Sequence, residues 1–118
     1  MTTLRLALPT EGDRGMRDAV SDVFARAAAF TLVEVADGEV KEVSVEENTA
    51  SSLKQGAGPL VTKTLKEKGV EVVVAGELGS GARTLLEMSG IRAVRVDPGT
   101  KVKDALDEAL KQLVLTAS

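Results

Sequence analysis

The chain contains no cysteine and no histidine among its 118 residues. Without cysteine there are no disulfides, thiolate metal sites or cysteine nucleophiles. Without histidine the commonest metal ligand and the commonest general base are both missing. A serine–histidine–aspartate hydrolase is therefore excluded, and no complete catalytic set is visible. The chemistry that remains belongs to carboxylates, lysines, hydroxyls and backbone amides.

Aromatic residues are almost absent as well, since Phe24 and Phe30 are the only two. A base-stacking surface has no residues to build it, and a net charge of −3 argues against nucleic acid as a partner. No apolar run approaches the ~20 residues of a membrane-spanning helix. Residues Met1–Leu4 contain no hydrophobic signal region. We therefore predict no nucleic-acid partner, no membrane partner and a cytoplasmic location.

The most informative stretch that is present is Val70–Gly81. It begins as a β-branched run, the pattern of a strand that is covered on both faces. It then turns into a glycine-rich segment, Gly76–Gly81, which is followed by helical periodicity. In parallel α/β sheets, ligands bind beyond the carboxyl ends of the strands. The segment Gly76–Gly81 is therefore the first place to expect a small ligand.

The rest of the chain alternates between strand and helix patterns. Strands are predicted over Leu4–Leu8, Phe30–Ala36, Val40–Val45, Val70–Ala75 and Ile91–Val96, and helices over Met16–Arg26, Pro59–Lys68, Ser80–Ser89 and Thr100–Leu113. Asp37-Gly38 is typical of a tight hairpin turn, so the second and third strands are antiparallel. The charged third and fifth strands suit sheet edges. We expect one α/β domain over residues 1–118, with a core of about 4–113 and helices on both faces of a mixed five-stranded sheet.

Several local details follow from the same patterns. Pro9 is expected to end the first strand, and Ser80 and Thr100 are expected to cap the helices that begin beside them. Val23 and Phe24 are expected to face the core.

A series of short strings gives the chain a family resemblance. They are Ser21-Asp22-Val23-Phe24-Ala25-Arg26-Ala27, Asp37-Gly38, Gly56-Ala57-Gly58-Pro59, Lys68-Gly69-Val70, Ala75-Gly76, Gly90-Ile91 and Gly99-Thr100. In this order, over about Leu4–Leu113, they resemble the dinitrogenase iron–molybdenum cofactor biosynthesis family of small nitrogenase accessory proteins. The resemblance implies a three-layer α/β/α fold of the ribonuclease H-like type, with strand order 3-2-1-4-5 and strand 2 antiparallel. It also implies a non-enzymatic carrier of iron–molybdenum cofactor precursors or related metal–sulfur clusters, with a possible partner protein of cofactor assembly.

The chain departs from the family pattern at three places. Family members often carry histidine where this chain has Val23, Gln55 and Glu77. Metal–sulfur clusters prefer soft thiolate or imidazole ligands, which are missing here. An anionic cluster can instead be held by backbone amides and counter-charge. We therefore predict no side-chain metal site and no catalytic residue.

The candidate ligand-binding residues lie at two glycine-rich helix starts. They are Arg26, Lys54, Gln55, Gly56, Ala57, Gly58, Gly76, Glu77, Gly79 and Ser80. The plainer alternative is that the glycines only serve tight turns, and that Arg26 pairs with Asp22 one helical turn earlier. A two-metal nuclease is disfavoured because Leu4–Leu8 carries no carboxylate. The second hypothesis is a protein-interaction or regulatory module that keeps the scaffold and has lost cluster binding.

Overall fold

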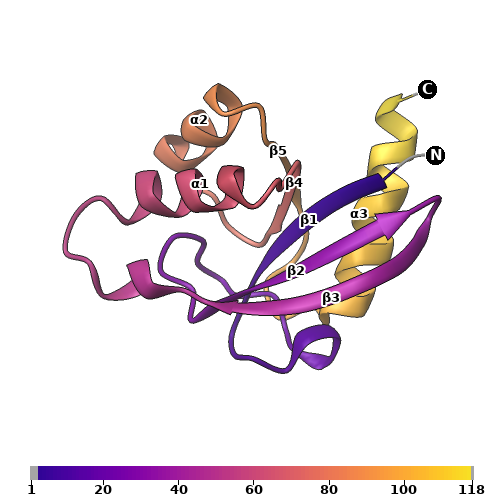
Figure 1. Cartoon of the computed structure of the whole chain (residues 1–118), viewed down its shortest axis with the longest axis horizontal. Coiled ribbons are helices and arrows are strands. Elements are labelled where there is room, and N and C mark those ends of the chain that lie inside the picture. The colour runs from indigo at the N-terminus through magenta and orange to yellow at the C-terminus, as the bar shows by residue number, and fades with distance from the viewer. Residues whose placement is uncertain (1–2, 118) are drawn as a thin grey trace.

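The computed structural model describes residues 3–117. These residues form a five-stranded sheet in the order β3-β2-β1-β4-β5 (Figure 1). The strands are β1 (Thr3–Thr10), β2 (Ala29–Ala36), β3 (Glu39–Glu47), β4 (Val72–Ala75) and β5 (Arg92–Arg95). The helices are α1 (Ala57–Glu67), α2 (Ser80–Met88) and α3 (Val102–Ala117), with short 3₁₀ turns η1 (Gly15–Arg17) and η2 (Thr49–Ser52).

The pairing directions in the sheet confirm the predicted fold class. Strand β1 is antiparallel to β2 and parallel to β4, while β4 is parallel to β5 and β2 is antiparallel to β3. The hairpin between β2 and β3 turns at Asp37 and Gly38, whose φ angles are 53° and 83°. Two successive positive φ angles match the right-handed twist of the flanking strands. The charged strands β3 and β5 lie at the two edges, as expected.

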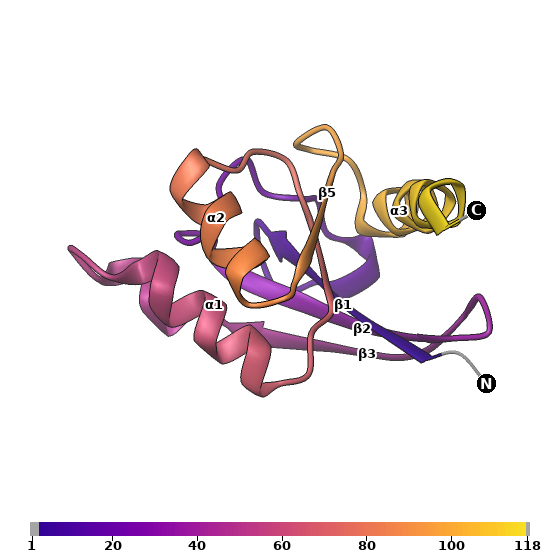
Figure 2. The ribbon, with the colours of Figure 1, turned by 90° about the horizontal axis from the view of Figure 1, so that it is seen from above.

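Two apolar layers hold the helices against opposite faces of the sheet. Figure 2 shows α1 and α2 on one side of the strands and α3 on the other. In β1, Leu6 and Leu8 belong to the core beneath α3, whereas Ala7 belongs to the core beneath α1 and α2. This alternation follows the two-residue period of a strand. All four residues of β4 are buried, which confirms that this strand is covered on both faces.

The predicted helix over Met16–Arg26 does not form. Only the turn η1 is helical, and the chain then runs irregularly to β2. Its backbone groups are engaged elsewhere, since the N–H of Ser21 donates to the Pro9 carbonyl and the N–H of Val20 to the Thr100 carbonyl, both at 2.8 Å. A backbone that pairs with other segments cannot also form the i to i−4 bonds of a helix.

Some expected boundaries and orientations also change. Strand β1 continues through Pro9 to Thr10. Proline has no N–H group to donate, but within β1 only Leu6 and Ala7 pair with β4, so no hydrogen bond to β4 is lost at Pro9. Helix α3 begins at Val102, and the Thr100 hydroxyl donates to the Asp97 carbonyl instead of capping the helix.

The orientation of two neighbouring residues was predicted half correctly. Phe24 is buried against Phe30 in an edge-to-face contact, as expected. Val23 was expected to face the core as well, but its side chain is 43% exposed. The missing helix explains the difference, because residues 21–28 form bends and turns and helical periodicity does not determine which way Val23 points.

Candidate functional site

The segments that follow β1, β4 and β5 meet at the carboxyl edge of the sheet. A Cβ atom built on Gly76 would lie 2.7 Å from Cγ of Pro98 and 3.0 Å from the carbonyl oxygen of Ser21. Ser21 is itself held to the end of β1 by its bond to Pro9. Gly76 is therefore required by close packing of three segments, which favours the plainer interpretation of this particular glycine.

The start of α2 has free backbone donors. Gly79 is the N-cap residue, and no side chain accepts a hydrogen bond there. Ser80 is the first helical residue, so its predicted capping role is wrong by one position. Within residues 3–117, no hydrogen bond engages the N–H groups of Ser80 and Gly81. These amides lie at the positive end of the helix dipole and are available to an anion.

The start of α1 is uncapped in the same way. Gly56 occupies the N-cap position with a φ of 81° and has no capping side chain. Ala57 is buried and Gly58 is half-buried. A Cβ on Gly58 would lie 3.5 Å from Cδ1 of Leu85, so the first turn of α1 packs against α2. The two helix starts thus belong to neighbouring helices of one layer (Figure 2).

Three glycines at these helix starts are not explained by the fold. Gly58, Gly79 and Gly81 all lack the positive φ that favours glycine. A Cβ would meet nothing within 4 Å at Gly79 or Gly81, and only an ordinary van der Waals contact at Gly58. Neither backbone conformation nor packing requires glycine at these positions. What glycine provides there is unobstructed access to the backbone.

A small cleft adjoins the start of α2. It has a volume of about 120 Å³, and its charged lining comes from Glu77, Arg83 and Arg95. The remaining lining residues are Ala75, Gly76, Leu78 and Ala93. Arg95 Nη2 lies 3.9 Å from Glu77 Oε1, and Arg95 Nη1 lies 3.5 Å from Asp97 Oδ1. Of the candidate residues from the sequence, Gly76 and Glu77 line this cleft. The others do not; they are Arg26, Lys54, Gln55, Gly56, Ala57, Gly58, Gly79 and Ser80.

Arg83 and Arg95 are not among the site residues predicted from the sequence. Arg95 follows the two-residue alternation of β5 and therefore shares a face with Ala93. Arg83 is the fourth residue of α2. Helical side chains lean toward the N-terminus, which brings Arg83 back to the cleft. Strand parity and helix direction together are the signal that could have identified both residues.

Arg26 contacts backbone carbonyls instead of an acidic side chain. Its guanidinium donates to the carbonyl oxygens of Ser51, Leu53 and Lys54. The alternative pairing with Asp22 is wrong, because no ion pair between these two residues occurs in the described part of the chain. Arg26 therefore holds the loop that leads into α1, and its positive charge stays beside that loop.

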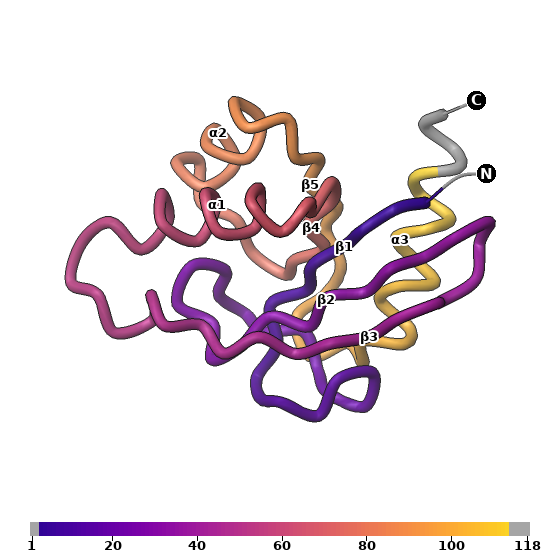
Figure 3. Tube along the Cα trace, in the orientation of Figure 1, coloured from indigo at the N-terminus to yellow at the C-terminus, as the bar shows by residue number. Residues whose placement is uncertain are grey.

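Asn48 also joins this loop to the segment that carries Arg26. Its Nδ2 donates to the carbonyls of Ala25 and Ala27, both at 2.9 Å, and its Oδ1 accepts from the N–H of Ala50. Figure 3 traces the long connection from β3 to α1 that these bonds anchor. Lys54 and Gln55 are exposed at its tip. Asn48 is also absent from the residues predicted from the sequence, because its partners become visible only in the fold.

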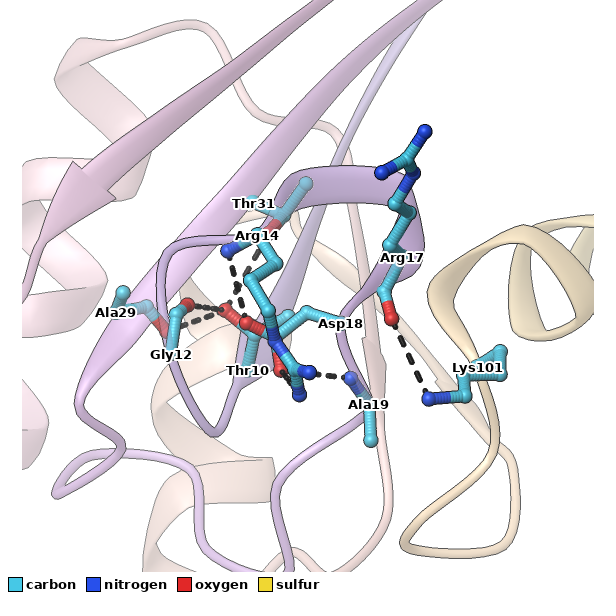
Figure 4. Close-up of polar contacts among 9 residues, drawn as sticks. All are labelled: Thr10, Gly12, Arg14, Arg17, Asp18, Ala19, Ala29, Thr31 and Lys101. Atoms are coloured by element: carbon cyan, nitrogen blue, oxygen red, sulfur yellow. Dashed lines mark hydrogen bonds and ion pairs between the residues drawn. The ribbon is translucent and has the colours of Figure 1, made fainter.

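A buried carboxylate organises the loop after β1 (Figure 4). The side chain of Asp18 is fully buried and accepts hydrogen bonds from the N–H groups of Arg14 and Ala19, at 3.0 and 2.8 Å. Burial by itself raises the pKa of Asp18, but these bonds and the Arg14 guanidinium outweigh it, so the pKa lies below its ordinary value. Nearby, the buried hydroxyl of Thr10 donates to the carbonyl of Gly12.

The structure contains a larger cleft that does not include the start of α2. It has a volume of about 220 Å³ and lies between α1 and the end of β3, with Phe30 and Leu32 among its lining residues.

In the described residues 3–117, no group of three or more acidic side chains is placed to hold a metal ion. Within the same range, no helix has the length and apolar character needed to cross a membrane.

Together these features define a small three-layer α/β protein with two uncapped helix starts on one side of its sheet. Comparison with known proteins identifies the family: the model for the dinitrogenase iron–molybdenum cofactor family matches residues 4–112. Because this match covers nearly the whole chain, the protein belongs to that family.

Individual relatives agree with this assignment. The apo form of the orange protein from Desulfovibrio gigas is 29% identical, with a TM-score of 0.80 and coverage of 92% of this chain and 88% of that one. A Thermotoga protein described as a candidate NifB protein of the DUF35 family is 35% identical, with a TM-score of 0.74 and the same coverages. An uncharacterized protein of Methanocaldococcus jannaschii is 26% identical over 92% of this chain and 83% of its own length.

Proposed function

We propose that this protein is a non-enzymatic carrier of an anionic metal–sulfur cluster, an iron–molybdenum cofactor precursor or a related species. The cluster binds at the starts of α1 and α2. The observation that carries the proposal is the set of three glycines, Gly58, Gly79 and Gly81, that neither packing nor backbone conformation requires. Membership of the cofactor family supports a cluster as the ligand.

Backbone amides supply the attraction for such a ligand. The first N–H groups of α2 have no partner in the described chain, and neither α1 nor α2 has an acidic residue in its first turn. Acidic side chains are normally favoured there because they complement the helix dipole. Their absence keeps both helix starts positive and leaves that role to an external anion.

Binding of this kind involves no covalent bond to the metal. The chain has no histidine or cysteine, so sulfide ligands of the cluster remain in place and accept hydrogen bonds from the protein. Lys54 is exposed on the loop before α1 and Arg26 lies at the base of that loop, so both add positive charge. A cluster held in this way can be handed on intact, which is what a carrier must do.

The test is reconstitution without oxygen, using tetrathiomolybdate as a coloured, soluble molybdenum–sulfur anion. We expect one equivalent to remain with the protein through gel filtration, measured by visible absorption and by metal analysis. The variant Gly79→Val should weaken binding, because its side chain covers the amides of α2. The control Thr84→Val places a valine further along α2 and removes only the hydrogen bond from the Thr84 hydroxyl to the Ser80 carbonyl, so it should bind normally. Colourless protein under every condition would exclude the carrier function.

The second candidate function is a protein-interaction or regulatory module. It is favoured by exposed apolar side chains beside the same edge of the sheet, where Val23 is 43% and Leu53 is 37% exposed. On this alternative the protein binds no thiometalate, and Gly79→Val behaves like the wild type in every assay. The reconstitution experiment therefore distinguishes the two functions.

A further inference from the structure

The cleft beside α2 brings together two arginines from different elements. Ala93 and Arg95 share the face of β5 that is turned toward α2, and Arg83 reaches the same cleft from the helix. The cleft volume of 120 Å³ is well above the roughly 10–15 Å³ that one water molecule needs. It can accept a small anion or one edge of a larger one.

Within the described residues, these two arginines form few interactions with the rest of the chain. The side chain of Arg83 forms no hydrogen bond or ion pair among residues 3–117, and a cation near the start of a helix opposes the helix dipole. Arg95 is shared between Glu77 and Asp97 at 3.9 and 3.5 Å. The three side chains are 59%, 67% and 86% exposed, so these long pairs are weak and easily exchanged.

We propose that Arg83 and Arg95 are the anion-recognition pair of this cleft, and that Glu77 is an internal anion that competes with the ligand for Arg95. This inference rests on the proposed carrier function and specifies how its ligand is selected. A bound anion takes the place of Glu77 beside Arg95 and also pairs with Arg83. When the anion leaves, Glu77 pairs with Arg95 again.

The proposal assigns opposite effects to neighbouring charges. Removal of either arginine eliminates a charged donor to the ligand and should weaken binding about tenfold. Removal of the negative charge of Glu77 frees Arg95 and should strengthen binding by about two- to fivefold. A purely structural role for Glu77 would predict weaker binding or no change.

The experiment is an oxygen-free titration of the full chain with tetrathiomolybdate, followed by visible absorption. The variants are Arg83→Gln, Arg95→Gln and Glu77→Gln. Arg92→Gln is the matched control, because it removes the same charge from the same strand but lies on the opposite face, with Val94. We expect weaker binding in the first two variants, tighter binding in the third and wild-type binding in the control. Circular dichroism of each variant tests whether it is folded.

The outcomes separate this inference from the proposed function. If the wild type binds and Gly79→Val does not, but the three variants bind like the wild type, the recognition pair is wrong and the carrier function stands. Equal losses in Arg83→Gln, Arg95→Gln and Arg92→Gln would also overturn the pair, because net charge alone would then explain binding. If the wild type binds no thiometalate, both proposals are wrong.

Discussion

Gly76 and Pro98 approach each other so closely that a Cβ on Gly76 would lie 2.7 Å from Cγ of the proline ring. The contact joins the turn after β4 to the turn after β5. The variant Gly76→Ala must push these turns apart, and we expect a loss of about 1–3 kcal/mol in the free energy of unfolding. Urea denaturation measures it. A variant as stable as the wild type would show that the two turns can separate without cost.

Gly81 should behave in the opposite way. It lies in the first turn of α2, and a Cβ there meets nothing within 4 Å. Alanine restricts the unfolded chain and favours the helix, so Gly81→Ala should raise the free energy of unfolding by about 0.5–1 kcal/mol. If the amides form the binding site, the same variant should bind tetrathiomolybdate more weakly. A variant that is more stable and binds normally would argue against close approach of the ligand at Gly81.

The buried carboxylate of Asp18 should make stability depend on acid. Its pKa lies below the ordinary value, so its contribution is fully present above the unfolded-state pKa of about 4 and is lost as the pH falls through the folded-state pKa. Asp18→Asn should cost about 1–3 kcal/mol at pH 7, because one carboxylate accepts two backbone N–H bonds. Denaturation at several pH values should show the two proteins converging in stability below pH of about 4. Curves that stay parallel would contradict this assignment.

Local sequence signals predicted their elements correctly, whereas elements that depend on distant residues were not predictable. The hairpin at Asp37 and Gly38 was predictable because two adjacent residues determine the turn, and the buried strand β4 because its own composition reports burial. The segment from Asp18 to Ala28 was not predictable. Its backbone partners, including Pro9 and Thr100, are distant in the sequence, and helical periodicity carries no information about them.

The features of the candidate site divide in the same way into local ones, which were predictable, and non-local ones, which were not. Free amides at the starts of α1 and α2 could be predicted, because glycines and an absence of acidic residues are visible in the sequence. The partners of Arg26 could not, because its carbonyl acceptors in Ser51, Leu53 and Lys54 lie at least 25 positions away. Short-range spacing favoured Asp22 only because that residue is close in sequence.

Arg26 offers a test of positioning against charge. Its guanidinium reaches the carbonyls of Ser51, Leu53 and Lys54 through a planar fork that lysine cannot reproduce. If the loop depends on this fork, Arg26→Lys should raise hydrogen exchange in residues 51–56 as much as Arg26→Ala does. If Arg26 acts mainly as a counter-charge for the ligand, Arg26→Lys should instead retain tetrathiomolybdate binding that Arg26→Ala loses. Measurement of exchange and binding in both variants assigns the role.

Asn48 is the other anchor of that loop, and its amide group cannot be replaced by a carboxylate. The side chain is 7% exposed, and its Nδ2 donates to two carbonyl oxygens, those of Ala25 and Ala27. Asn48→Asp keeps the acceptor for Ala50 but turns an oxygen toward those two carbonyls, where it meets only other acceptors. We expect a loss of about 2–4 kcal/mol in the free energy of unfolding, measured in urea.

The comparison variant for Asn48→Asp is Asn48→Ala, which removes the same donors without adding a buried charge. It should cost less, because an unpaired buried carboxylate is more expensive than an absent side chain. If both variants lose the same stability, the donors of Asn48 alone matter. If Asn48→Asp is the more stable of the two, water reaches the side chain and the loop is open.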